Sequence, residues 1–160
     1  MGRSLLGLIG WIALSFLAAA VGGLFRPGEW YLSLDRPAWT PPGWIFPPVW
    51  TALYATMGFA AWLVWKERGW RAGAAPLAIF VVQLLFNAAW SWLFFGLHRP
   101  GLALFDIVAL WIGILATVIA FWHVRPAAGA LLIPYLAWVS FATFLNAEIW
   151  LRNPGPWGTR

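Results

Sequence analysis

The sequence predicts an all-α membrane protein, a bundle of five transmembrane helices in a single domain over residues 1–160. Composition is the first reason. Apolar residues make up 62% of the chain and charged residues only 9%, against about 25% charged residues in typical soluble domains. Length is the second reason, because five apolar segments reach the roughly 20 residues that a helix needs to cross hydrocarbon. They lie at about 5–25, 44–65, 73–97, 101–122 and 128–151.

The first segment has some features of a secretory signal, with Arg3 ahead of an apolar run and the small residues "LAAAVGG" after it. Its apolar run is longer than a usual signal core, which favours a retained span. The segment also carries small residues on one face, and small residues let helices approach closely. This face holds Gly7, Ser15, Ala18 and Gly22, with Trp11 among them.

Residues 26–43 form the longest predicted connection, and they lead into the proline-rich stretch "WTPPGWIFPPVWTALY". Pro41 and Pro42 keep the preceding backbone extended, whereas Pro47 and Pro48 suit the first turn of a helix. Long connections are often lids. We therefore expect a stiff lid over one mouth of the bundle; the alternative is an interfacial aromatic belt that needs no ligand. The rings expected near the opening are Trp30, Tyr31, Trp39 and Phe46.

Three of the later segments each place a stripe of rings on one helical face, at 100° per residue. The stripe of segment 44–65 holds Trp50, Tyr54, Met57, Ala61 and Trp65. The stripe of segment 73–97 holds Gln83, Asn87, Trp90 and Phe94. The stripe of segment 128–151 holds Trp138, Phe141, Ala142, Leu145 and Ile149, with Asn146 at its edge.

These stripes predict a pocket between the helices. An amide in hydrocarbon needs a hydrogen-bond partner, so Asn87 should face protein. Converging rings with a few polar groups are typical of a small-molecule site. The alternative is that the rings face lipid or the interface, and for a single tryptophan that is the commoner arrangement. Taken together, Trp50, Asn87 and Trp138 favour the pocket.

Segment 101–122 has a bulky face, which we expect to meet lipid, and a small face, which we expect to pack inward or against a second protomer. The bulky face holds Trp111, Leu115, Val118 and Trp122. The small face holds Asp106, Ala109, Gly113 and Thr117. An acid within a span is costly unless it is paired or hydrated. Asp106 is therefore either a structural hydrogen-bond partner of a neighbouring helix or a contact for a proton or ligand.

Several function classes are disfavoured. The chain has no cysteine, and antiparallel helices would put His98 and His123 at opposite membrane faces, on the order of 30 Å apart. No metal site and no required cofactor are therefore expected. No hydrolytic triad or phosphate-binding loop is present. The net charge of +5 comes from scattered basic residues; these resemble membrane-edge anchors rather than a nucleic-acid surface. The charge count of the two membrane sides is tied, so orientation is not predicted.

Three stretches together resemble the translocator protein family, called tryptophan-rich sensory proteins in bacteria. They are "LDRPAWTPPGWIFPPVWTALY", "QLLFNAAWSWLFFG" and "PYLAWVSFATFLNAEIW". The resemblance covers nearly the whole chain. It implies a multi-pass protein of a bacterial cell membrane, often a homodimer, with a cavity under the first loop. The expected ligands are porphyrins, haem-like tetrapyrroles and drug-like hydrophobic molecules.

The resemblance also implies roles for particular residues. The positions that match the family's cavity are Trp50, Tyr54, Asn87, Trp90, Trp138, Ala142 and Leu145. In some bacterial members, tryptophans matching Trp50 and Trp138 are linked with light- and oxygen-dependent breakdown of protoporphyrin. An enzyme of that kind is thus the alternative to a sensor, regulator or carrier, and a scaffold anchored by its rings is a third hypothesis. The stretch "LNAEIWLR" lacks the tyrosine of the animal cholesterol pattern, so tight cholesterol binding is not expected.

Overall fold

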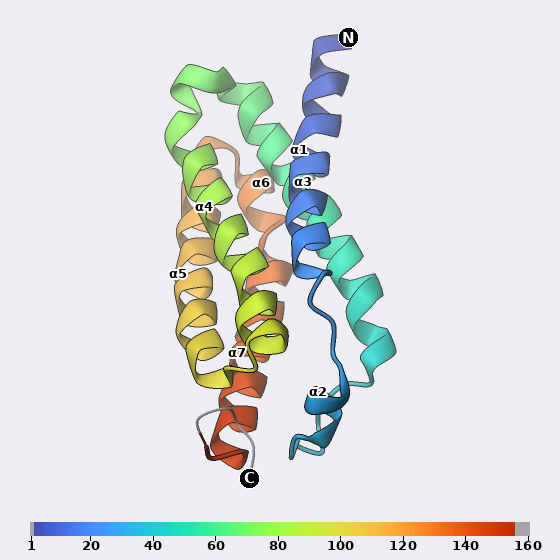
Figure 1. The fold of residues 1–160 in the computed structure, drawn as a ribbon. Helices are drawn as coiled ribbons and strands as arrows, with labels where there is room; N and C mark the ends of the chain where they lie inside the picture. The colour runs from blue at the N-terminus through green and yellow to red at the C-terminus, as the bar shows by residue number, and fades with distance from the viewer. Residues whose placement is uncertain (1, 156–160) are drawn as a thin grey trace.

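A computed structural model describes residues 2–155, and this part of the chain is helical throughout its regular elements, with no strand. The chain runs up and down as a bundle, so that α1 begins and α7 ends at opposite ends (Figure 1). The long helices are α1 (Gly2–Gly22), α3 (Phe46–Ala72), α4 (Ala74–Ser91), α5 (Pro100–Val124) and α7 (Ile133–Arg152).

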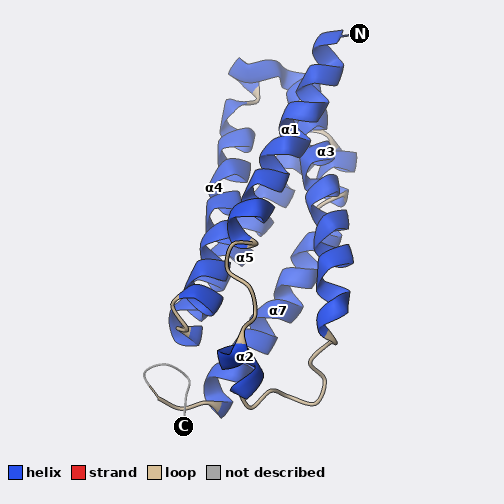
Figure 2. Ribbon diagram, turned by 45° about the vertical axis from the view of Figure 1, so that its right-hand side comes forward, coloured by secondary structure: helices blue, strands red, loops and turns tan. Residues whose placement is uncertain are grey.

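Shorter elements fill the connections and the helix ends. Two lie in the connection between α1 and α3, one extends α4 as a π-helical segment, and one precedes α7. They are α2 (Glu29–Ser33), η1 (Gly43–Ile45), η2 (Trp92–Gly96) and α6 (Pro126–Ala130). Figure 2 shows that α2 lies below the lower end of α1, with loop on both sides of it.

Four stretches are long and apolar enough to cross a membrane: Ser4–Gly22, Ala74–Gly96, Pro100–Val124 and Pro126–Arg152. The chain is therefore a multi-pass, all-helical membrane protein. The helix α3 is as long as these stretches but is not among them. The predicted count of five spans is thus not confirmed, and α3 is taken up again below.

Small residues bring the helices into close contact. A Cβ atom on Gly58 of α3 would lie 2.6 Å from the Ile12 Cα atom of α1, which is closer than any side chain tolerates. A Cβ on Gly113 of α5 would lie 3.1 Å from the Gln83 Cβ of α4. Ser15 and Thr117 are buried as well. The small face of the fourth segment was expected to pack inward or against a second protomer, and its Gly113 and Thr117 pack inward.

The structure corrects several boundaries. The helix predicted at 44–65 continues through the charged stretch to Ala72, with a kink at Gly69, whose φ of 66° suits glycine. Charged side chains at a membrane edge are good helix formers, so charge alone did not end this helix. The segment predicted at 128–151 is broken at Leu131 and Leu132, just ahead of Pro134. The first helix ends at Gly22 rather than at residue 25.

The expectation that the bulky face of α5 meets lipid is wrong for one of its tryptophans. The indole Nε1 of Trp111 donates a hydrogen bond to the Ser140 Oγ of α7 at 2.8 Å. Trp122, near the C-terminal end of α5, is exposed as expected. The face is therefore shared, with Trp111 joining two helices and Trp122 facing outward.

The predicted lid is fastened to the other end of the chain. The Asp35 N–H donates to Asn153 Oδ1, and Asn153 Nδ2 donates to the Asp35 carbonyl, each at 2.9 Å. Asn153 caps α7 and also donates to the Ile149 carbonyl at 2.8 Å. The loop after α2 therefore has a fixed position relative to α7.

Candidate ligand-binding site beneath the first loop

A buried chain of hydrogen bonds joins α3, α4 and α7. The Tyr54 hydroxyl donates to Asn87 Oδ1. Asn87 Nδ2 donates to the Tyr135 hydroxyl, which in turn donates to Gln83 Oε1, both at 2.9 Å. Asn87 is 5% exposed and Tyr135 only 1%. The expectation that the Asn87 amide faces protein is confirmed, and its partners are two phenols from different helices.

A row of rings leads from this network towards the loop. Trp50 stacks on Tyr54 with ring centroids 5.4 Å apart and meets Tyr135 edge-on at 6.2 Å. Phe46 meets Trp138 at 5.8 Å, which links the start of α3 to α7. These ring contacts are within the range of favourable aromatic pairs. Rings from α3 and α7 thus line a common wall at the loop end of the bundle.

The wall continues into the loop itself. Trp138 lies 5.6 Å from Phe141, and Phe141 lies 5.7 Å from Trp39, measured between ring centroids. Trp39 belongs to the turn that follows Pro37 and is 47% exposed. The loop ring is therefore the outermost member of a continuous row that starts at Trp138.

Other predicted residues form a second group, where α2 docks on η2. Trp30 and Tyr31 each contact Phe94 edge-on, at 5.8 and 6.2 Å. Trp30 also stacks on His98 at 4.4 Å. The buried indole N–H of Trp30 bonds to no described residue. Leu145 belongs to this group as well. These side chains attach the lid to the helices below it.

Trp90 connects the two groups. Its ring stacks on Phe94 at 5.0 Å, and it packs against both buried clusters. Its Nε1 donates to Asn146 Oδ1 at 2.9 Å, while Asn146 Nδ2 donates to the Pro100 carbonyl at 2.8 Å. Ala142 packs against the first cluster. The structure therefore gathers the predicted residues at one end of the bundle, but in two adjoining groups instead of one.

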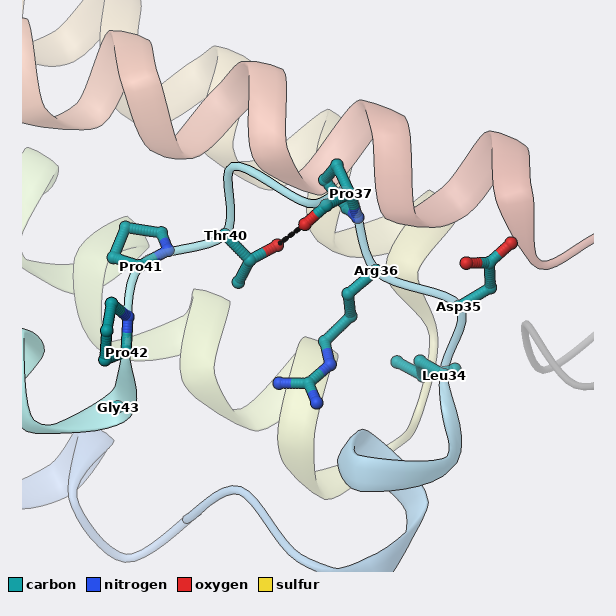
Figure 3. Close-up of a pocket in the computed structure, with 8 residues that line it drawn as sticks. All are labelled: Leu34, Asp35, Arg36, Pro37, Thr40, Pro41, Pro42 and Gly43. Atoms are coloured by element: carbon teal, nitrogen blue, oxygen red, sulfur yellow. Dashed lines mark hydrogen bonds between the residues drawn. The ribbon is translucent and has the colours of Figure 1, made fainter.

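A cavity of about 420 Å³ lies within the loop itself (Figure 3). Its walls are eight consecutive or nearly consecutive residues: Leu34, Asp35, Arg36, Pro37, Thr40, Pro41, Pro42 and Gly43. Thr40 closes the turn, because its hydroxyl and its N–H both donate to the Pro37 carbonyl, at 2.7 and 3.0 Å. The predicted lid thus contains a hollow of its own, lined by loop residues alone.

Sequence reasoning missed two residues that hold the site together. Tyr135 stands in the centre of the hydrogen-bond network, and Asn153 fastens the loop. Tyr135 precedes Trp138 by three positions, a spacing that places both on neighbouring parts of one helical face. That spacing was the available signal for Tyr135. Asn153 lies beyond the apolar segment and carried no comparable signal.

The Oδ2 atom of Asp106 is buried and has no hydrogen-bond partner within the described part of the chain. The expected hydrogen bond to a neighbouring helix is thus not seen at this atom, and the role of Asp106 stays a prediction. Within residues 2–155, no group of three His, Asp or Glu side chains is placed to hold a metal ion.

The fold and the ring-lined, amide-bearing site define a class: a multi-pass helical membrane protein with an aromatic site at one end of its bundle. Residues 11–151 match the TspO/MBR family. The chain is 42% identical to the human translocator protein, over 90% of this chain and 88% of the relative. It is 42% identical to the tryptophan-rich protein TspO of Chlorobaculum tepidum, over 96% and 100%. It is 43% identical to the tryptophan-rich sensory protein of Cereibacter sphaeroides, over 88% and 90%.

The chain belongs to the TspO/MBR family. The resemblance inferred from the three sequence stretches is confirmed.

Proposed function

We propose that this protein binds flat, hydrophobic ligands of the porphyrin class beneath its first loop and acts as a membrane sensor, regulator or carrier. The observation that carries the proposal is the row of rings from α3, α7 and the loop beside the Tyr54–Asn87–Tyr135 network. Rings offer a flat ligand large contact areas, and a few polar groups orient it. The names of the relatives, translocator and sensory proteins, support a role at a membrane.

Two further parts of the proposal concern the assembly. We propose that α3 is a fifth span. It runs beside α1 over the depth of the bundle (Figure 1), and rings and hydroxyls, rather than charges, lower the apolarity of its first five turns.

We also propose a homodimer. The small faces of α1 and α5 are used inside the protomer, so the partner would contact outward-facing apolar side chains. The mass of the purified protein, measured by light scattering, tests this.

The central test is titration of the purified protein with protoporphyrin in the dark, followed by quenching of tryptophan fluorescence. We expect saturable quenching by the wild type. Trp50→Phe combined with Trp138→Phe should weaken binding about tenfold or more, because stacking on an indole contributes on the order of 1 kcal/mol per ring. Trp44→Phe is the matched control, since Trp44 is 73% exposed and has no ring partner among the described residues.

Repeating the titration in light separates binding from breakdown. A stable porphyrin absorbance in the presence of protein supports the sensor, regulator or carrier. If instead a defined porphyrin product forms with turnover, and changing Trp50 or Trp138 abolishes its formation, the protein is an enzyme that breaks down porphyrin and the proposed sensor, regulator or carrier is rejected. Equal quenching in the wild type, the double variant and Trp44→Phe would reject a specific site and leave a scaffold anchored by its rings.

A further inference from the structure

The cavity in the first loop has an unusual set of donors. Three of its eight wall residues are prolines, which have no N–H to offer. The Thr40 hydroxyl already donates to the Pro37 carbonyl, and the Asp35 N–H already donates to Asn153. The strongest donor left on the wall is the Arg36 guanidinium. The wall also carries one carboxylate, that of Asp35. A cavity in which a guanidinium is the strongest donor suits an anionic group that can approach the guanidinium directly.

Arg36 is held in place without an acidic partner. Its guanidinium carbon lies 4.9 Å from the centre of the Tyr31 ring, over its face. Within the described residues, the ion pairs join Arg125 to Glu67 and Arg152 to Glu148, and neither involves Arg36. Cation–π contact orients a guanidinium while leaving its N–H groups free for a carboxylate. Figure 3 shows the Arg36 side chain extending beneath the arch of the loop, while the side chain of Asp35, which also lines the cavity, points away from the Arg36 guanidinium.

The walls of this cavity are stiff. Pro37, Pro41 and Pro42 restrict the backbone, and the hydrogen bonds of Thr40 and Asn153 close the turn and fasten its start. A preformed cavity loses little conformational entropy when a ligand group enters it. The position of Arg36 is therefore built into the folded loop.

The cavity and the row of rings both draw on the turn at residues 37–40. Trp39 lies between the cavity residues Pro37 and Thr40 in the chain, and it contacts Phe141, which contacts Trp138. A ligand with a flat apolar body and an acidic edge would meet rings on the bundle side and a guanidinium on the loop side. Such a ligand can be oriented by both at once.

We propose that Arg36 and the loop cavity form a carboxylate subsite, which fixes the acidic edge of an amphipathic ring ligand at the loop. This inference rests on the proposed function, and it assigns to the same site a chemical selectivity for acids and a single ligand orientation. The cavity volume of about 420 Å³ accommodates a carboxylate side chain together with its hydration.

The test compares protoporphyrin with its dimethyl ester, which has the same ring without the negative charges. Wild type, Arg36→Gln and Arg26→Gln are titrated in nanodiscs of neutral lipid, after circular dichroism has shown that each variant is folded. We expect Arg36→Gln to weaken binding of the diacid about tenfold, because a charge-assisted hydrogen bond is lost, and to leave ester binding unchanged. Arg26→Gln is the matched control, an exposed arginine outside the cavity whose Nε donates to the Gly23 carbonyl.

Each other result has a distinct meaning. Equal weakening of diacid and ester by Arg36→Gln would make Arg36 structural and overturn the subsite, as would no weakening of either. Failure of the wild type to bind the ester and the diacid would reject the proposed function itself. A further titration uses nanodiscs with added anionic lipid. An effect of Arg36→Gln seen only there would assign the cavity to a lipid headgroup and overturn the proposal.

Discussion

Asn87 shows how one polar residue can be kept inside an apolar bundle. Its carbonyl oxygen accepts from Tyr54 and its amino group donates to Tyr135, so both ends of the amide are satisfied by side chains from other helices. Gln83, one turn earlier on α4, accepts from Tyr135. The network therefore fixes the relative rotation of α3, α4 and α7 at the depth where the rings begin.

At this scale we expect Asn87→Leu to lower the free energy of unfolding by about 1 to 2 kcal/mol, because the buried Tyr54 hydroxyl loses its acceptor. Thermal or denaturant unfolding in detergent, followed by circular dichroism, measures the change. Thr51→Ala is the control: its exposed hydroxyl donates to the Pro47 carbonyl, and its loss should change stability by less than about 0.5 kcal/mol. If Asn87→Leu has the same free energy of unfolding as the wild type, the hydrogen-bond network makes no net contribution to stability.

Sequence and structure agree on Asn87 for a physical reason. A lone amide in hydrocarbon must find a partner, so its inward orientation follows from its position alone. Periodicity could have placed Tyr135 near the face of Trp138, but its hydrogen bonds to Asn87 and Gln83 depend on the register between α4 and α7, which one segment does not contain. Tyr54 was predicted as a member of a stripe, yet its bond to Asn87 required the same inter-helix information.

Among the elements, the first loop differs most from its sequence-based description. Its rings and prolines indicated a stiff lid, and the structure adds α2, η1 and a cavity between them. The stiffness is only partly local. It depends on Asn153, which lies 118 positions away from Asp35.

We expect Asn153→Ala to loosen this loop without unfolding the bundle. Two hydrogen bonds to Asp35 are lost, each contributing on the order of 1 kcal/mol, so local opening should become at least about tenfold more frequent. Hydrogen–deuterium exchange of peptides covering 34–37 measures this, with peptides from the middle of α3 as the internal reference.

The control for this change is Glu148→Gln, which removes an exposed pair with Arg152 on α7 and touches no loop residue. Its exchange at 34–37 should equal that of the wild type. If Asn153→Ala also exchanges at the wild-type rate, the hydrogen bonds to Asp35 do not hold the loop, and ring packing on η2 must do so alone.

For the whole molecule, the helical class and most helix positions follow from sequence, because apolar length is what a bilayer requires of a span. The helix α5 begins at Pro100 and α7 ends at Arg152, each within a residue or two of the expected position. The extension of α3 did not follow. Helix propensity continues past the membrane edge, so the charged residues after Trp65 end the apolar run but not the helix.

A labelling experiment tests whether α3 crosses the membrane. The chain has no cysteine, so single exposed cysteines can be introduced by Ser33→Cys and Glu67→Cys. In sealed vesicles, a membrane-impermeant maleimide should reach these two positions from opposite sides, because α3 separates them. Arg152→Cys is the matched control and should react from the same side as Ser33→Cys. If positions 33 and 67 react from the same side of the membrane, α3 does not cross it.

The hydrogen bonds between Asp35 and Asn153 also order events during biosynthesis. A ribosome releases residue 35 long before residue 153, so the loop leaves the translocon while its fastening residue has not yet been synthesised. A nascent chain truncated before Asn153 can insert its helices, but its first loop lacks the two hydrogen bonds that fasten Asp35 to α7. The loop can therefore take up its fixed position only after α7 and Asn153 have been synthesised.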